Sequence, residues 1–126
     1  MPEMALPKIL FLVPLVAAGV LLPAAGPAPA APASEALGMT HEDYARDEVD
    51  LRVGDTLTLA NSSRWAHTIG PGRGGTLRDR AAEPVTGATL MQTNDVYTTG
   101  RWNTPGIFYL TCSVHPDMTV KVVVRP

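Results

Sequence analysis

Three side chains that can bind a metal ion stand close together near the C-terminal end of the sequence: Cys112, His115 and Met118. Their spacing, Cys-x-x-His-x-x-Met, combines a thiolate, an imidazole and a thioether in one short segment with alternating apolar residues before and after it. Soft sulfur ligands favour copper, and one cysteine, two histidines and a weakly bound axial methionine make a trigonal copper site. The segment therefore predicts a metal-binding loop between two strands, with copper as the metal.

A second imidazole must come from elsewhere, because the segment contains only one. The sequence has three histidines in all, so the candidates are His41 and His67. His41 has polar neighbours and no other ligand at a metal-binding spacing, which is typical of a solvent-exposed strand histidine. His67 follows a strand, where a single histidine is more often an ordinary polar residue than a ligand. Because the copper site needs a second imidazole, we nevertheless expect one of these two histidines to be a ligand.

Residues 103–118, together with residues 54–61 and with His67 upstream, resemble the blue copper proteins, or cupredoxins. The short loop is most similar to the amicyanin type, since other types carry more residues between the histidine and the methionine. The resemblance extends over about residues 36–126 and selects His67 over His41, because His67 follows the family's strand, turn, strand and Asn pattern. It implies an all-β, Greek-key β-sandwich.

The resemblance also implies a ligand set of His67, Cys112, His115 and Met118 around one copper ion. Such a protein passes single electrons between redox partner proteins as the ion alternates between Cu(II) and Cu(I). His67 is then expected to be buried and His115 to lie at the surface. Thr68 stands where many relatives have an Asn that ties the two ligand loops together, so the threonine hydroxyl is the expected substitute.

An apolar patch is expected to surround His115, with Trp65, Pro71 and Pro116 as candidate members. Arginines gather around and after His67, and we expect Arg64, Arg73 and Arg80 to help orient an acidic partner. The formal net charge of the whole chain is only −2, so no strong field favours nucleic acid or anionic lipid.

Period-two alternation of apolar residues predicts several short strands within residues 36–126. Two of these strands, joined at the Gly54-Asp55 turn, are expected to form an antiparallel sheet. The glycine-rich residues 70–75 are expected to form a loop, and Met91 is expected to fill the core. The expected strands are residues 37–44, 49–53, 57–60, 85–91, 96–99, 107–111 and 119–124, with a helical turn possible in residues 76–82.

The N-terminal segment predicts export. Its apolar run, residues 9–22, has about the length of a signal-peptide core and is shorter than the roughly twenty residues that span a bilayer. We therefore expect a signal peptide over residues 1–25, a Pro/Ala-rich linker over residues 26–35 and a copper domain over residues 36–126. An uncleaved segment would instead tether the protein to the membrane, and either outcome places the domain in the periplasm or outside the cell.

A single cysteine cannot form a disulfide within the chain, and metal binding both engages the thiol and stabilises a small domain. Four protein ligands leave no open position for a substrate, and no other residues combine a nucleophile with a base, so we expect that the protein is not an enzyme. We also expect a monomer. A periplasmic copper carrier or storage protein is the alternative function. Five scattered methionines are poor support for it.

Overall fold

The computed structural model describes residues 14, 15, 17–78 and 82–126. This part of the chain contains strands and no helix. Within it there is accordingly no helix of the length and apolar character that a membrane crossing requires. The strands are β1 (Ser34–Met39), β2 (Glu48–Arg52), β3 (Thr56–Asn61), β4 (His67–Arg73), β5 (Thr76–Leu77), β6 (Thr89–Met91), β7 (Val96–Thr98), β8 (Gly106–Cys112) and β9 (Thr119–Arg125).

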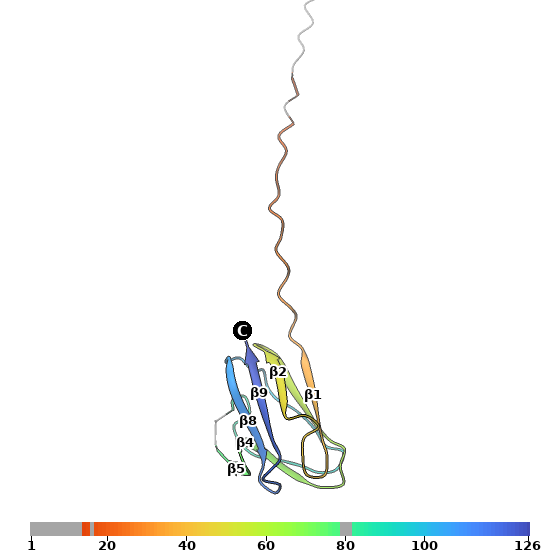
Figure 1. Cartoon of the computed structure of the whole chain (residues 1–126). Helices are drawn as coiled ribbons and strands as arrows, with labels where there is room; N and C mark the ends of the chain where they lie inside the picture. Colours follow the sequence, from red (N-terminus) through yellow and green to blue (C-terminus); the bar gives the residue numbers. More distant parts are fainter. Residues whose placement is uncertain (1–13, 16, 79–81) are drawn as a thin grey trace, which may run out of the picture.

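The strands of the described residues form two sheets that pack face to face (Figure 1). One sheet has three strands in the order β1-β3-β7, and the other has the order β2-β9-β8-β4-β5, with β6 also paired to β4. The chain crosses from one sheet to the other after β1, β2, β3, β6 and β7. These crossings confirm the expected Greek-key β-sandwich.

Strands β2 and β3 follow the alternation in the sequence, but their partners differ from the prediction. Val49 and Leu51 of β2 are buried, as are Leu57 and Leu59 of β3, while the residues between them face outward or lie at intermediate depth. The expected antiparallel pairing of the two strands is wrong, because β2 pairs in parallel with β9 and β3 pairs in parallel with β1. Both strands turn their apolar residues to the same core from opposite sheets.

The turn at Gly54 and Asp55 makes this change of sheet. Gly54 has φ of 95°, a region that favours glycine. The Asp55 carboxylate accepts hydrogen bonds from the main-chain N–H groups of Ala33 and Arg52, both at 2.8 Å. These two bonds lower the pKa of Asp55 and tie the start of β1 to the turn.

The glycine-rich residues 70–73 belong to β4, so the predicted loop is wrong there. Glycine allows close approach in this strand: a Cβ on Gly72 would lie 2.0 Å from the carbonyl oxygen of Thr76 in the neighbouring β5. The predicted helical turn is also wrong at Thr76 and Leu77, which form β5, while residues 79–81 lie outside the described part. Of the predicted strand 85–91, only Thr89–Met91 is a strand.

The first strand begins earlier and ends earlier than predicted. β1 spans Ser34–Met39, so it includes the last two residues of the expected linker, and residues 40–45 turn back against its end. Residues 17–33 are exposed and contain no helix or strand. The part before residue 29 runs away from the sandwich (Figure 1), whereas residues 29–33 lie beside the turn between β2 and β3. The expected signal peptide lies largely in residues outside the described part, and its cleavage stays a prediction.

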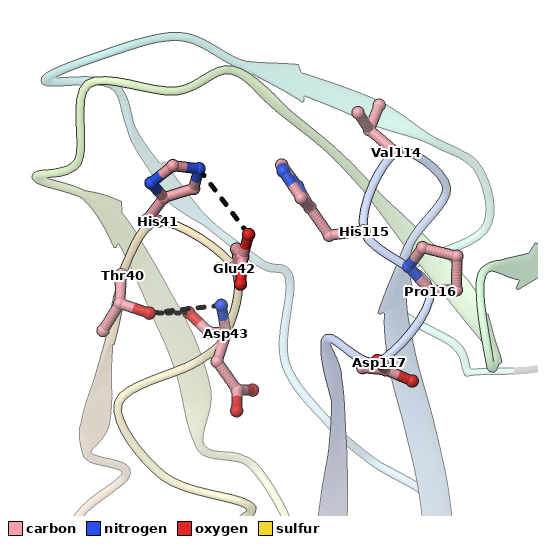
Figure 2. A pocket seen from close by; sticks show the side chains of 8 residues that line it. All are labelled: Thr40, His41, Glu42, Asp43, Val114, His115, Pro116 and Asp117. Carbon is pink, nitrogen blue, oxygen red and sulfur yellow. Dashed lines mark hydrogen bonds and ion pairs between the residues drawn. The ribbon is translucent and has the colours of Figure 1, made fainter.

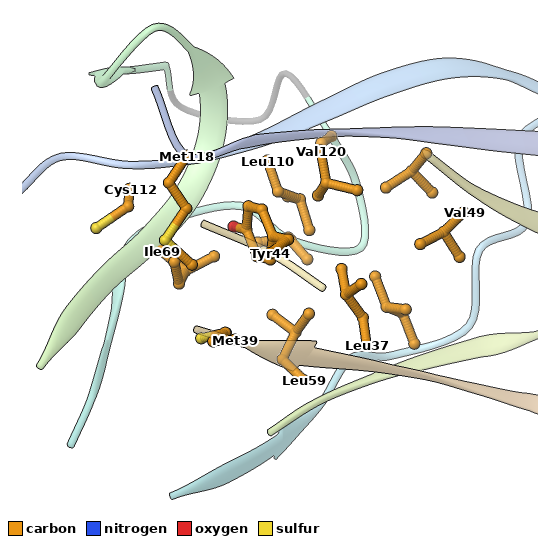
Figure 3. Packing of buried hydrophobic residues seen from close by; sticks show 14 of the residues in the cluster. Leu37, Met39, Tyr44, Val49, Leu59, Ile69, Leu110, Cys112, Met118 and Val120 are labelled. Atoms are coloured by element: carbon orange, nitrogen blue, oxygen red, sulfur yellow. The ribbon is translucent and has the colours of Figure 1, made fainter. Parts of the chain in front are cut away.

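Side chains from both sheets form one hydrophobic core (Figure 3). Met91 is fully buried in it, as predicted. The core also holds a small polar cluster: the hydroxyl of buried Thr99 accepts hydrogen bonds from Leu57 N–H and from the indole N–H of Trp102, both at 3.0 Å. The same hydroxyl donates to the carbonyl of Gly100.

Replacing Thr99 with Val should destabilise the domain by about 2 kcal/mol or more, because two buried N–H donors lose their acceptor. The matched control is Thr98→Val, where the hydroxyl is exposed and lies 2.9 Å from the Thr58 hydroxyl. That change should stay within about 0.5 kcal/mol. Urea unfolding of the two variants measures the difference, and equal stabilities would contradict the assignment.

Candidate metal centre

The predicted metal-binding loop connects β8 to β9. Cys112 is the last residue of β8, and Met118 immediately precedes β9. The two strands are paired up to Thr111 and Thr119, whose hydroxyls lie 2.9 Å apart. The Thr111 hydroxyl also contacts the Met118 carbonyl oxygen at 3.2 Å. The loop is thus closed at its base by side chains as well as by the strand pairing.

Main-chain hydrogen bonds hold the inside of the loop. Cys112 N–H donates to Met118 C=O, and Met118 N–H donates to His115 C=O, both at 3.0 Å. Ser113 N–H donates to the Thr68 carbonyl oxygen at 3.0 Å, which ties the loop to β4. This is the link that the sequence predicted for the Thr68 side chain, and the main chain makes it instead. Pro116 packs against Gly75 of the β4–β5 turn.

The pairing of β4 with β8 brings His67 to this loop. Ile69 pairs with Cys112, which places His67 beside the thiol although 45 residues separate them in the chain. The Cys112 Sγ lies 3.8 Å from His67 Nδ1 and 3.7 Å from His115 Nδ1. One ligand atom from each of these three side chains lies within 4.8 Å of the others.

Both imidazoles therefore turn the same ring nitrogen, Nδ1, toward the cysteine sulfur. Their ring centroids are 5.0 Å apart, with the rings tilted by 52°. His67 and Cys112 are completely buried, while His115 is half-buried, as the sequence predicted. Donor atoms that lie this close together and point toward one another can bind a single metal ion.

The hydrogen bonds of His67 determine which of its nitrogens is free to bind a metal. Its Nε2 lies 3.1 Å from the Thr40 carbonyl oxygen, which can only accept, and 3.2 Å from the Ser63 hydroxyl. The Ser63 hydroxyl donates its proton to the Asn61 side-chain oxygen at 2.7 Å. Nε2 therefore carries the hydrogen, and Nδ1 presents its lone pair to Cys112.

Buried Asn61 shapes the segment that leads into His67. Its amide N–H₂ donates to the carbonyl oxygens of Trp65, at 2.7 Å, and Met91, at 3.1 Å. Its oxygen accepts hydrogen bonds from Ser63 N–H and from the Ser63 hydroxyl. All four hydrogen-bonding positions of this side chain hold the connection between β3 and β4 in one shape.

Met118 is completely buried, and its main chain bonds to that of Cys112, so its thioether belongs to the same end of the core.

Burial lowers the pKa of His67 below its usual value of 6.5, and the nearby His115 lowers it further. The Thr40 carbonyl opposes this shift in the pKa. A neutral imidazole and soft sulfur donors fit a copper ion.

His41 lies outside the donor cluster. It follows β1 in a turn instead of lying in a strand, and its ring stacks on Trp65 with centroids 4.4 Å apart. Its ring also meets that of His115 edge-on at 6.2 Å. Figure 2 shows the two histidines on opposite sides of an open hollow of about 720 Å³ that also exposes Glu42 and Asp117.

The surface around His115 agrees only partly with the sequence prediction. Trp65 is half exposed and Pro116 is exposed, whereas Pro71 is buried in β4 and cannot belong to a surface patch. Val114, which sequence reasoning missed, is exposed beside His115. Sequence reasoning also missed the Thr40 and Ser63 contacts of His67, because no local pattern marks a carbonyl or hydroxyl that meets the imidazole only after folding.

Of the three predicted partner-orienting arginines, Arg80 lies outside the described residues. Arg73 is exposed and stacks over the Tyr109 ring at 4.1 Å, and Arg64 lies beside Trp65. Their role in docking stays a prediction.

Solved structures with the same arrangement of strands include amicyanins. A reduced, Cu(I) form of an amicyanin mutant is 24% identical, with 73% of this chain and 82% of that chain covered and a TM-score of 0.59. Amicyanin from Paracoccus versutus is 23% identical, with 78% and 85% covered and a TM-score of 0.59.

A purple cupredoxin from Nitrosopumilus maritimus is 17% identical, with 71% of this chain and 98% of that chain covered and a TM-score of 0.59. The chain has the cupredoxin fold. No protein-family model matches the sequence, and the curated proteins contain no significant match. Within the cupredoxin fold, the donor cluster lies where β4 meets the loop between β8 and β9.

The copper-free protein should lose stability as the pH falls below about 6.5, because the unfolded chain then binds a proton that buried His67 in the folded state resists. The free energy of unfolding in urea, measured on either side of that pH, tests this sign. His67→Gln should make the decrease shallower. An unchanged slope in the variant would contradict the assignment.

Asn61→Ala should lower copper affinity by about 10-fold or more and reduce stability, because the segment that carries His67 loses its internal hydrogen bonds. Asn103→Ala is the control, since Asn103 is exposed and follows Trp102, whose main chain bonds to Gly54 and Asp55 at the opposite end of β3 from Asn61. Competition with a chelator measures the affinity. Equal affinities for the two variants would show that Asn61 does not support the site.

Proposed function

We propose that this chain is an exported mononuclear blue copper protein that transfers single electrons between redox partner proteins. His67, Cys112, His115 and Met118 are its ligands in this proposal. The observation that carries it is the convergence of two Nδ1 atoms on the Cys112 sulfur, at 3.7 and 3.8 Å, with His67 supplied from a different strand. A bound copper ion supplies the one-electron Cu(II)/Cu(I) couple.

The protein contributes rigidity and insulation to this function. Three of the proposed ligands belong to a loop closed by the Thr111–Thr119 pair, and the fourth begins a strand that bonds to that loop. Cu(II) and Cu(I) prefer different geometries, so ligands held in one arrangement reduce the rearrangement that accompanies each electron. Complete burial of His67, Cys112 and Met118 excludes water from that side.

Electrons would enter and leave through His115, the only half-exposed member of the proposed ligand set. Its ring lies at the hollow described above, beside exposed Val114 and Pro116. A partner docked at this face would come close to the metal without opening the core. Four protein ligands leave no open position for a substrate, which favours electron transfer over catalysis.

The alternative is a copper carrier or storage protein. Such a protein must release its metal, and the interlocked hydrogen bonds around His67 and the loop favour retention. The N-terminal apolar run supports export to the periplasm or the cell exterior, and a monomer remains our expectation for the oligomeric state.

The purified, copper-loaded and oxidised domain should be blue, with intense copper-thiolate absorption at about 600 nm and a matching EPR spectrum. His67→Ala should lose most of this colour, because one of the three strong ligands is removed. His41→Ala should keep it, because His41 lies outside the donor cluster. A colourless wild type would refute the proposed function, and full colour in His67→Ala would refute the ligand assignment.

A further inference from the structure

Tyr44 is a deeply buried tyrosine whose hydroxyl has no hydrogen-bond partner among the described residues. The residue is only 4% exposed, and its oxygen is the one buried side-chain polar atom in that part of the chain left without a partner. An unpaired buried polar group destabilises the folded state, so native proteins rarely keep one without a reason. The electron-transfer function does not by itself explain this hydroxyl.

The main chain holds Tyr44 firmly in place. Tyr44 forms a β-bridge with Met39, and the next residue, Ala45, donates its N–H to the Gly38 carbonyl at 2.9 Å. The Asp43 carboxylate accepts the Tyr44 N–H at 2.8 Å. The same short turn carries Thr40, whose carbonyl accepts from His67 Nε2. The turn that positions Tyr44 therefore also contacts a proposed copper ligand, through Thr40.

The hydroxyl lies at the metal-binding end of the core. In Figure 3 the oxygen of Tyr44 lies on the side of its ring that faces Cys112 and Met118. All three residues belong to one buried cluster. Burial raises the pKa of the Tyr44 phenol, and the nearby Cys112 and Asp43 raise this pKa further. The phenol therefore keeps its proton and can act only as a neutral dipole whose hydrogen rotates freely.

We propose that Tyr44 is a positioning residue of the copper centre, with its O–H dipole turned toward the Cys112 sulfur to stabilise the thiolate charge. This inference rests on the proposed function. The hydroxyl makes no hydrogen bond to the sulfur or to any other described group, so its dipole is free to turn toward the thiolate charge and acts on it through space. In a dry core such a dipole acts strongly, since little solvent screens it.

The proposal predicts the sign of the effect on the reduction potential. Polar groups around the cysteine sulfur tune the potential of such sites. A dipole that stabilises charge on the sulfur weakens electron donation from the sulfur to the metal, and this favours Cu(I) over Cu(II). Removing the hydroxyl should therefore lower the reduction potential and move the copper-thiolate band to longer wavelength.

The test is Tyr44→Phe, which deletes the hydroxyl and keeps the ring. Voltammetry and optical spectra of the copper-loaded protein should show both shifts, while urea unfolding of the copper-free protein should show no loss of stability. Tyr97→Phe is the matched control, because Tyr97 is a partly buried tyrosine of β7 in the opposite sheet from the metal-binding loop. It should leave potential and band unchanged.

The outcomes separate the two proposals. A blue wild type with an unchanged potential and band in Tyr44→Phe overturns the role of Tyr44 alone. A clear loss of copper-free stability in Tyr44→Phe also overturns it, because the hydroxyl would then have a partner unrelated to copper. A wild type without the copper-thiolate band overturns the proposed function and the role of Tyr44 with it.

Discussion

The metal centre depends on the antiparallel pairing of β4 with β8. This pairing sets Ile69 opposite Cys112 and so delivers an imidazole from the middle of the chain to a thiol near its end. A slip of one residue would turn His67 to the other face of the sheet, because side chains alternate along a strand. Such a slip would be costly, because His67 and Ile69 of β4 would both leave the core, where His67 is paired with buried Met91 of the neighbouring β6.

Hydrogen bonds from other segments hold the side chains of the metal centre in place. Thr40 and Ser63 occupy the outer nitrogen of His67, and the Thr111–Thr119 pair closes the loop that carries the other donors. These contacts come from four different segments of the chain. The centre is thus held from several sides at once, which is the property that a site for fast electron transfer needs and that a site for metal release does not.

Sequence reasoning succeeded where the pattern is local and failed where partners are remote. Alternation in residues 49–53 and 57–60 predicts two strands with buried leucine and valine, and the structure has both, although Val53 lies beyond the end of β2 and is exposed. Their assignment to one antiparallel sheet is wrong, because a short turn looks the same in sequence whether it joins neighbours or crosses between sheets. The glycines of β4 predicted a loop by composition, yet they belong to a strand whose neighbours lie too close for side chains.

The amino-acid sequence by itself determined the chemistry of this protein: a thiolate, an imidazole and a thioether at fixed spacing, and a short choice of histidines to complete the set. Those features are residue types and spacings along the chain, so they can be recognised without knowing how the chain folds. Only the tertiary structure decided that His67 turns its Nδ1 toward Cys112, that the Thr40 carbonyl meets the other nitrogen of His67, that Pro71 is buried and that His41 stacks on Trp65. Each of these depends on contacts between segments far apart in the chain, which pair only when the two sheets close on their common core.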